Sequence, residues 1–297
     1  MKYAWIEKNM LRWPVCVQCR VLEVRVSGYH QHQARRKKIL NRRHLSETAL
    51  LVEIRAVYIE ARGAYGWPRV WRQLRSQGVR VGKRRVQLAM QQNGLRARGK
   101  RRFRVVTTDS NHALPIAPNL LARNFTVAVA NTVWAGDITY IPTREGWLYL
   151  AVVLDLFSRR IVGWSMGPAI TAELACRALQ MAWHSRLPMA GLIFHSDRGS
   201  QYASDCYANL LAGYGIKASM SRKGNCWDNA CSETLFGSLK VERLHGTELQ
   251  TLREARDTTL NWLLWYNRSR LHSTLGYLSP AQFEKTLDHH QHTALAA

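Results

Sequence analysis

The chain has 297 residues and a formal net charge of +23, from 43 Lys and Arg against 20 Asp and Glu. Hydrophobic residues make up 46% of the sequence, which is enough for packed cores and excludes a disordered tail. The sequence has no apolar run long enough to cross a membrane, and its first residues lack the apolar stretch of a signal peptide. We therefore expect a soluble protein of the cytoplasm.

The positive charge is concentrated in the first part of the chain. Residues 1–130 contain 27 Lys and Arg but only 6 Asp and Glu, whereas residues 131–297 contain 16 and 14. Such an excess favours binding of a polyanion, because each neutralised phosphate releases condensed counterions. A solvated basic surface and an anionic lipid surface are the alternatives. The basic residues are interleaved with helical patterns rather than gathered in a tail, so nucleic acid is the expected partner.

The six cysteines are too few and too scattered for a disulfide framework in a chain of this length, so we expect free thiols. Cys16 and Cys19 are followed by His30 and His32, which raises the question of zinc. The two histidines are one residue apart, whereas a zinc finger usually separates them by three to five residues. Zinc is therefore not expected.

The basic half divides into an N-terminal basic helical segment, 1–45, and an all-α DNA-binding domain, 46–104. Apolar spacing in the second predicts helices over 46–63, 68–78 and 83–93. Only four residues join the last two helices, which is typical of a helix-turn-helix; an ordinary helical bundle is the alternative. The residues expected to contact DNA at the start of the last helix are Lys83, Arg84, Arg85 and Gln87.

After a linker, 105–130, the pattern changes to alternating strands and helices, which predicts an α/β domain with a mixed sheet over 131–245. A C-terminal helical extension is expected over 246–297. The expected strands are 133–141, 147–154, 161–166, 192–195 and 217–220. The expected helices are 171–185, 204–212, 228–244 and 248–266.

Several acidic residues of this domain occupy unusual positions. Asp137 lies inside an otherwise apolar strand, where a carboxylate must face a cleft, a cation or a strong donor. Asp197 follows a short apolar strand, and Glu233 lies one turn into a helix that Asp228 is placed to cap. Taken singly, Asp197 also fits a turn and Glu233 an exposed helical position. Asp155 is interpreted as the end of a hairpin strand.

The spacing of three of these residues carries a resemblance. Between Asp137 and Asp197 lie 59 residues, and between Asp197 and Glu233 lie 35. With Lys240 seven residues further on, this pattern resembles the DDE transposases and retroviral-type integrases. The sequence motifs around these residues resemble the OrfB-type transposases of bacterial insertion sequences. The motifs are WAGDITYI at 134–141, HSDRGSQY at 195–202 and WDNACSETLF at 227–236. The resemblance also includes the C-terminal residues Tyr266, Asn267, Arg268, Leu271, His272, Leu275, Gly276, Tyr277, Ser279 and Pro280.

The resemblance implies an RNase H-like, five-stranded mixed sheet with flanking helices, and catalysis by Asp137, Asp197 and Glu233. Phosphoryl transfer of this kind uses two Mg²⁺ ions, for which Mn²⁺ can substitute, and carboxylates are suitable ligands. Lys240 is then expected to contact DNA beside the metals. Arg222 and Lys223, in the loop before Gly224, are weaker candidates for the same role.

The resemblance also implies partners. These are the terminal inverted repeats and target DNA, the product of a second reading frame, OrfA, alone or as an OrfAB fusion, and further copies of this chain in a homo-oligomer on DNA. The expected location is the nucleoid of a prokaryotic cell. Two alternatives remain open at this point: a DNA-binding regulator with a vestigial core, and an RNase H-like nuclease that does not join strands.

Overall fold

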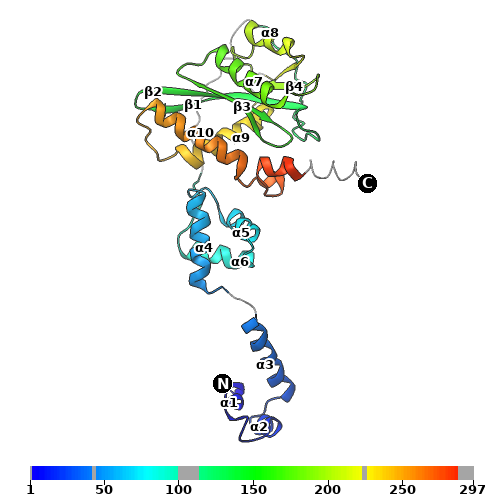
Figure 1. Ribbon diagram of the computed structural model, residues 1–297, viewed down its shortest axis with the longest axis vertical. Helices are drawn as coiled ribbons and strands as arrows, with labels where there is room; N and C mark the ends of the chain where they lie inside the picture. Colours follow the sequence, from blue (N-terminus) through cyan, green and yellow to red (C-terminus); the bar gives the residue numbers. More distant parts are fainter. Residues whose placement is uncertain (1, 42–44, 100–113, 223–225, 287–297) are drawn as a thin grey trace. The chain divides into compact units, whose positions relative to one another are not determined.

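The computed structural model describes residues 2–41, 45–99, 114–222 and 226–286 (Figure 1). The chain forms two compact units, Met1–Ala56 and Val57–Ala297. Among the described residues, no helix is both long enough and apolar enough to cross a membrane.

The first unit is helical. It contains α1 (Lys2–Asn9), α2 (Val15–Val21), α3 (Val26–Asn41) and the beginning of α4 (Glu47–Glu60). Its small core is formed by Ile6, Cys19 and Tyr29, which are all buried. Cys16, Cys19, Cys176, Cys206 and Cys231 are free thiols, as the sequence predicts for them.

The second unit begins within α4 and continues with α5 (Trp67–Ser76) and α6 (Lys83–Gln92), as the helical periodicity predicts. Pro68 lies in the first turn of α5, where its missing N–H costs nothing. Gly78, with a φ of 85°, ends α5 in the left-handed region that favours glycine. Trp71 donates a hydrogen bond to the carbonyl oxygen of Val81 (2.9 Å), which fixes the turn between the two helices.

A mixed five-stranded sheet follows, with the strand order β3-β2-β1-β4-β5. The pairs β1–β2 and β2–β3 are antiparallel, whereas β1–β4 and β4–β5 are parallel. This arrangement confirms the RNase H-like mixed sheet that the sequence predicts. The strands are β1 (Val133–Thr143), β2 (Gly146–Asp155), β3 (Ile161–Gly167), β4 (Ile193–Ser196) and β5 (Lys217–Met220).

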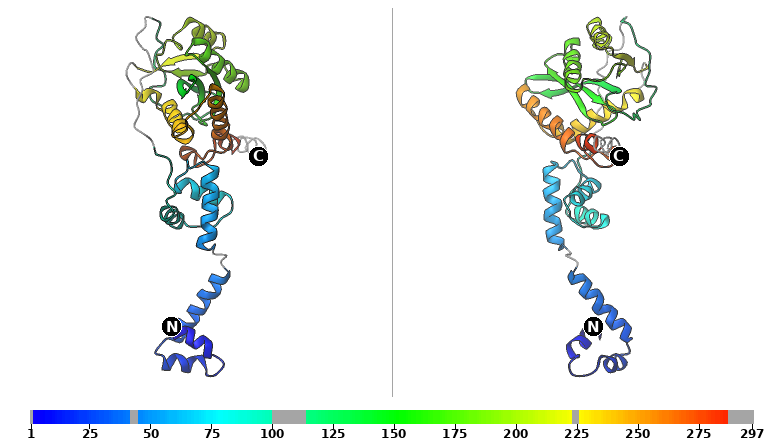
Figure 2. Two further views of the ribbon diagram at one scale, coloured as in Figure 1. Left: turned by 90° about the vertical axis from the view of Figure 1, so that its left-hand side faces the viewer. Right: turned by 45° about the vertical axis from the view of Figure 1, so that its right-hand side comes forward.

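Helices cover both faces of the sheet (Figure 2). On one face lie α7 (Ala172–Arg186) and α8 (Asp205–Gly213); on the other lie α9 (Ala230–Leu239) and α10 (Leu252–Arg268). Gly163 of β3 permits close packing of α7, because a Cβ atom at this position would lie 2.2 Å from the carbonyl oxygen of Ala178.

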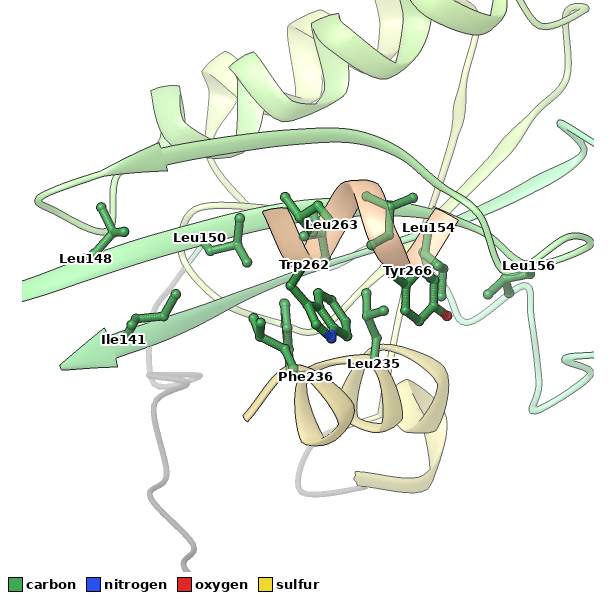
Figure 3. Packing of buried hydrophobic residues seen from close by; sticks show 14 of the residues in the cluster. Ile141, Leu148, Leu150, Leu154, Leu156, Leu235, Phe236, Trp262, Leu263 and Tyr266 are labelled. Atoms are coloured by element: carbon green, nitrogen blue, oxygen red, sulfur yellow. The ribbon is translucent and has the colours of Figure 1, made fainter. Parts of the chain in front are cut away.

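The core beneath α9 and α10 fixes these helices against the strands (Figure 3). Leu235 and Phe236 of α9 pack with Trp262 and Tyr266 of α10 and with Leu150 of β2. Trp262 and Leu150 are completely buried, and loss of a side chain of this size from a core costs about 3–5 kcal/mol. The C-terminal helix, predicted as part of an extension, thus packs directly on the sheet and helps to position α9.

Candidate active site

Asp137 lies in β1, and Asp197 directly follows the neighbouring strand β4. The parallel pairing of β1 with β4 ends at Ala135 and His195. Asp137 and Asp197 each lie two residues beyond this last pair, at the point where the edge of β1 is no longer covered by β4. Two carboxylates with 59 residues between them in the chain therefore lie just beyond the same end of this parallel pairing.

Local packing supports Asp137 from below. Its neighbour Gly136 leaves room for the ring of Phe194, since a Cβ atom on Gly136 would lie 2.3 Å from the ring. The half-buried Asp137 carboxylate accepts hydrogen bonds from the backbone N–H of Ile138 (2.8 Å) and from the side-chain amide of Asn229 (3.0 Å). The expected strong donor is therefore present, and it is a neutral amide.

The carboxylate of Asp137 interacts electrostatically with two other acidic residues. Burial raises the pKa of Asp137 well above its usual value, and the charges of Asp197 and Glu233 raise it further. The hydrogen bonds from Ile138 and Asn229 act in the opposite direction but do not cancel these effects. Asp197 and Glu233 therefore both lie within electrostatic reach of Asp137.

Asp197 and Glu233 reach the site from different elements. Asp197 follows β4 and accepts a hydrogen bond from the N–H of Gly199 (3.0 Å), so the turn role considered for it is also real. Glu233 is exposed and lies in the first turn of α9, as predicted. Asp155 ends β2 and is fully buried, with hydrogen bonds from the N–H groups of Asn131 (2.9 Å) and Phe157 (2.8 Å), in agreement with its interpretation as a strand end.

The donor set suits a hard divalent cation. In the described part of the chain, no three His, Cys, Asp or Glu side chains stand close enough together to hold a metal ion as they are. Asp137, Asp197 and Glu233 nonetheless supply only carboxylate oxygens, which Mg²⁺ and Mn²⁺ prefer. After burial, the charges of Asp197 and Glu233 also raise the pKa of Asp137, and a bound cation would relieve that repulsion.

Lys240 supplies positive charge next to the acidic group. It follows α9 as the first residue of a single π-helical turn, Lys240–Leu244. Its ammonium lies 4.5 Å from the centre of the Tyr140 ring. Burial lowers the pKa of Lys240, and the charge of Asp137 partly restores it, so the two groups interact. Lys240 therefore lies within electrostatic reach of Asp137.

A second carboxylate near the site has a different environment. Asp228 is fully buried and accepts hydrogen bonds from the backbone N–H and guanidinium of Arg222, from Arg123 and from Asn119, all at 3.0 Å. These donors hold the pKa of Asp228 well below its usual value. The expectation that Asp228 caps α9 is wrong, because its side chain is bound by arginines and the position before the helix is occupied by Asn229, which makes no side-chain cap hydrogen bond.

His195 ties this region to the sheet. Its ring is buried between the hydroxyl of Ser219 (2.9 Å from Nδ1) and the carbonyl oxygen of Asp228 (3.0 Å from Nε2). Burial lowers the pKa of His195, so the ring is neutral near pH 7. Sequence reasoning assigned no role to His195 or Asn229, although both lie within the words that carry the family resemblance.

The residues expected to contact DNA are placed as follows. Lys83, Arg84 and Gln87 are exposed on α6, whereas Arg85 is half-buried. The ammonium of Lys83 lies 5.0 Å from the centre of the Trp71 ring. Arg222 is engaged with Asp228, and its contact with DNA stays a prediction. Lys223 lies outside the described residues.

This chain is similar to known protein families and to several solved structures. Two stretches, 128–226 and 214–280, match the family described as integrase core domain, and residues 45–103 match the HTH-like domain family. Among solved structures, the catalytic core domain of BIV integrase aligns with a TM-score of 0.42 at 17% identity, over 55% of this chain and 99% of that one. The HTLV-2 integrase catalytic core domain in complex with magnesium gives a TM-score of 0.38 at 19% identity, over 52% of this chain and 97% of that one.

Curated relatives extend over nearly the whole chain. The transposase InsF for insertion sequence IS3A of Escherichia coli strain K12 is 44% identical over 285 residues, which cover 96% of this chain and 98% of the relative. A 31 kDa protein of insertion element IS600 from Shigella sonnei is 43% identical over 271 residues, which cover 90% of this chain and 97% of the relative. The chain therefore belongs to the IS3-family transposases, polynucleotidyl transferases with an integrase core domain.

Proposed function

We propose that this transposase cuts and joins DNA strands by phosphoryl transfer assisted by two divalent metal ions, with Asp137, Asp197 and Glu233 as the metal-binding catalytic residues. The observation that carries the proposal is that Asp137 and Asp197 each lie two residues beyond Ala135–His195, the last pair of the parallel strands β1 and β4. The raised pKa of Asp137, to which Glu233 contributes from α9, supports the inclusion of the third carboxylate.

The side chains divide the work by position. Asp137, Asp197 and Glu233 would hold the two cations through their carboxylate oxygens. Mg²⁺, or Mn²⁺ in its place, would supply charge neutralisation on the attacking and leaving oxygens when bound. Asn229 orients the Asp137 carboxylate through its 3.0 Å hydrogen bond. No side chain is proposed as a nucleophile, because water attacks in cleavage and a DNA 3′-hydroxyl attacks in joining.

Positive groups would hold the DNA. Lys240, next to Asp137, would bind a phosphate beside the cations. The exposed residues Lys83, Arg84 and Gln87 of α6, with Arg85, would read the terminal inverted repeats in the major groove. The matching HTH-like domain supports this assignment.

The proposal includes an assembly. We propose that the chain acts as a homo-oligomer on DNA and together with the OrfA product, either as a separate chain or as an OrfAB fusion. The resemblance to the OrfB frame supports this part, since in that arrangement the partner frame contributes the multimerising zipper. Co-purification of tagged OrfA with this chain, in the presence and absence of terminal DNA, tests it.

Strand cleavage and joining on defined DNA test the central proposal. The substrate is a labelled duplex that ends in the inverted repeat of the element, with a plasmid as the target, in Mg²⁺, Mn²⁺ or EDTA. The wild-type chain should nick and join in either metal but not in EDTA. Asp197→Asn and Glu233→Gln should abolish both steps. Asp257→Asn, an exposed acidic residue on α10, is the matched control and should retain both.

The outcomes separate the alternatives. Full activity of Asp197→Asn or Glu233→Gln would refute the catalytic assignment. Nicking without joining would favour a nuclease of the RNase H-like class, and metal-independent DNA binding without any nicking would favour a regulator.

A further inference from the structure

A cavity lies in the unit Val57–Ala297, and its lining shares no residue with the site around Asp137. The cavity has a volume of about 500 Å³. It is lined by residues from the end of α4, from α5, from the end of α10, and from the segment after α10 that includes the turn formed by residues 272–278. These helices are labelled in Figure 1. The turn belongs to the C-terminal sequence motif that is part of the family resemblance. The proposed chemistry gives this motif no role.

The lining is strongly basic. Three arginines contribute to it: Arg72 and Arg75 from α5, and Arg268 from the last position of α10. All three are exposed to solvent, and within the described ranges none of them lies within ion-pair distance of a carboxylate. Glu60 is the acidic residue in the lining. The cavity therefore presents unneutralised guanidinium groups.

Aromatic rings hold one of these arginines in place. The guanidinium carbon of Arg72 lies 5.0 Å from the centre of the Trp71 ring and 4.9 Å from the centre of the Tyr277 ring. The guanidinium of Arg75 lies 6.0 Å from the Trp71 ring. A planar guanidinium that stacks on aromatic faces is pre-oriented, and its edge remains free to donate paired hydrogen bonds to an oxyanion.

The turn that carries Tyr277 is rigid. His272 and Leu278 form an isolated antiparallel bridge, and the N–H of Tyr277 donates to the carbonyl oxygen of His272 (2.9 Å). Gly276 and Tyr277 both have positive φ values, 64° and 67°. This backbone conformation is costly for a tyrosine, so the surrounding hydrogen bonds must enforce it. The turn thereby keeps the ring of Tyr277 beside Arg72.

From these contacts we infer that the cavity binds the phosphodiester backbone of DNA, as a contact separate from α6 and from the catalytic carboxylates. Paired N–H donors of arginine match the oxygens of a phosphate. In a helix-turn-helix the helix before the recognition helix crosses the DNA backbone, and α5 stands in that position relative to α6. The inference rests on the proposed function to the extent that the chain binds DNA.

Salt dependence of binding tests the inference, because each phosphate contact adds about 0.9 to the slope of log affinity against log salt concentration. The probe is a fluorescent 40-base-pair duplex of arbitrary sequence, titrated with the full chain between 50 and 200 mM KCl. The test variant is Arg72→Gln with Arg268→Gln. The matched control, Arg253→Gln with Arg256→Gln, removes two exposed arginines from the other end of α10. Thermal melting verifies that both variants fold.

The test variant should bind every duplex more weakly, with a slope less steep by about two, whereas the control should keep the wild-type slope. Equal slopes for the two variants would overturn the inference. A Glu-rich peptide provides the second arm: if the test variant loses affinity for the peptide but not for DNA, the cavity serves an acidic protein and the inference is wrong. If the wild-type chain shows no salt-dependent DNA binding, the proposed function fails as well.

Discussion

Asp137 and Asp228 are two acidic residues of the same region, since Asn229, next to Asp228, donates a hydrogen bond to Asp137. Their carboxylates have opposite electrostatic environments. Asp137 is surrounded by other acidic groups and receives hydrogen bonds from neutral amides, and its pKa is raised. Asp228 is surrounded by Arg222 and Arg123, and its pKa is lowered. The second arrangement stabilises the fold, whereas the first costs stability and is maintained only where a ligand or a reaction requires it. The comparison thus distinguishes a structural acid, Asp228, from Asp137, the acid that we propose to be catalytic.

The two residues also contribute to folding stability with opposite dependence on pH. The folded state of Asp137 favours the protonated form, so its contribution becomes less favourable as the pH rises above about 4, the ordinary value for Asp. The folded state of Asp228 favours the ionised form, so its contribution is present above about pH 4 and is lost as the pH falls below that value.

The largest expected effect follows from neutralising the catalytic member of the pair. Asp137→Asn should reduce strand cleavage and joining at least about 10³-fold, which corresponds to about 4 kcal/mol of activation free energy. The melting temperature at pH 7.5 should rise by about 2 °C, because a repelled charge is removed. Assays on terminal DNA and thermal melting measure the two quantities. Activity within tenfold of wild type, or a marked loss of stability, would remove the distinction between the two acids.

Loss of the positive charge of Lys240, next to Asp137, should have the second largest effect. Lys240→Gln should reduce joining about 100-fold, or about 2.7 kcal/mol, because a phosphate contact near the reacting strand is lost. Quantified joining products on a plasmid target provide the measurement. Lys217→Gln, which removes an exposed lysine at the start of β5, is the control and should join normally. If Lys217→Gln reduced joining as much as Lys240→Gln does, the loss would reflect the overall charge of the chain and not a contact of Lys240.

Replacement of Asp228, the structural acid, should mainly lower the stability of the fold. Asp228→Asn should lower the free energy of unfolding by about 2 kcal/mol, because charge-assisted hydrogen bonds from Arg222 and Arg123 are weakened. The melting temperature should fall by about 4–8 °C at pH 7, and the difference from wild type should shrink as the pH falls below about 4. A difference that grows on acidification would contradict the assignment of the lowered pKa.

The smallest effect is the response of stability to Mg²⁺. At ten times its dissociation constant, a bound ion should stabilise the wild-type chain by about 1.4 kcal/mol, and the melting temperature should rise by about 3–5 °C. Asp228→Asn should retain this shift, whereas Asp137→Asn should lose it. Melting curves with and without MgCl₂, at constant ionic strength, decide the question. An equal shift in all three proteins would place the ion elsewhere.

The sequence predicts the fold well because its signals are local. Apolar alternation over β1 and β2 and the helical spacing in α5 and α6 depend on neighbouring residues, and the structure confirms these elements. The mixed sheet follows from three strands with short connections and then two strands separated by helices. The π-helical turn after α9 has no local signal, because it depends on burial of Glu242 against Arg270 and Trp262.

The candidate site is only partly predictable. Asp137 stands out because a carboxylate is unexpected in an apolar strand, and spacing then selects Asp197 and Glu233. The roles of His195 and Asn229 could not be predicted, since their partners lie far away in the chain: His195 contacts Asp228, and Asn229 contacts Asp137, 92 residues earlier. Asp228 was misjudged for the same reason, because a helix cap is a local pattern and its arginine partners are not.

The pairing of β1 with β2 extends over ten residues and sets Asp137 opposite Val152. A two-residue connection, Arg144–Glu145, joins the strands, and so short a loop fixes their register. Because side chains alternate between the faces of a strand, a slip of one position would turn the Asp137 carboxylate toward the far side of the sheet. A single-residue insertion or deletion in this short hairpin should therefore silence the enzyme even if the protein still folds, which makes the length of the loop as important as any residue in it.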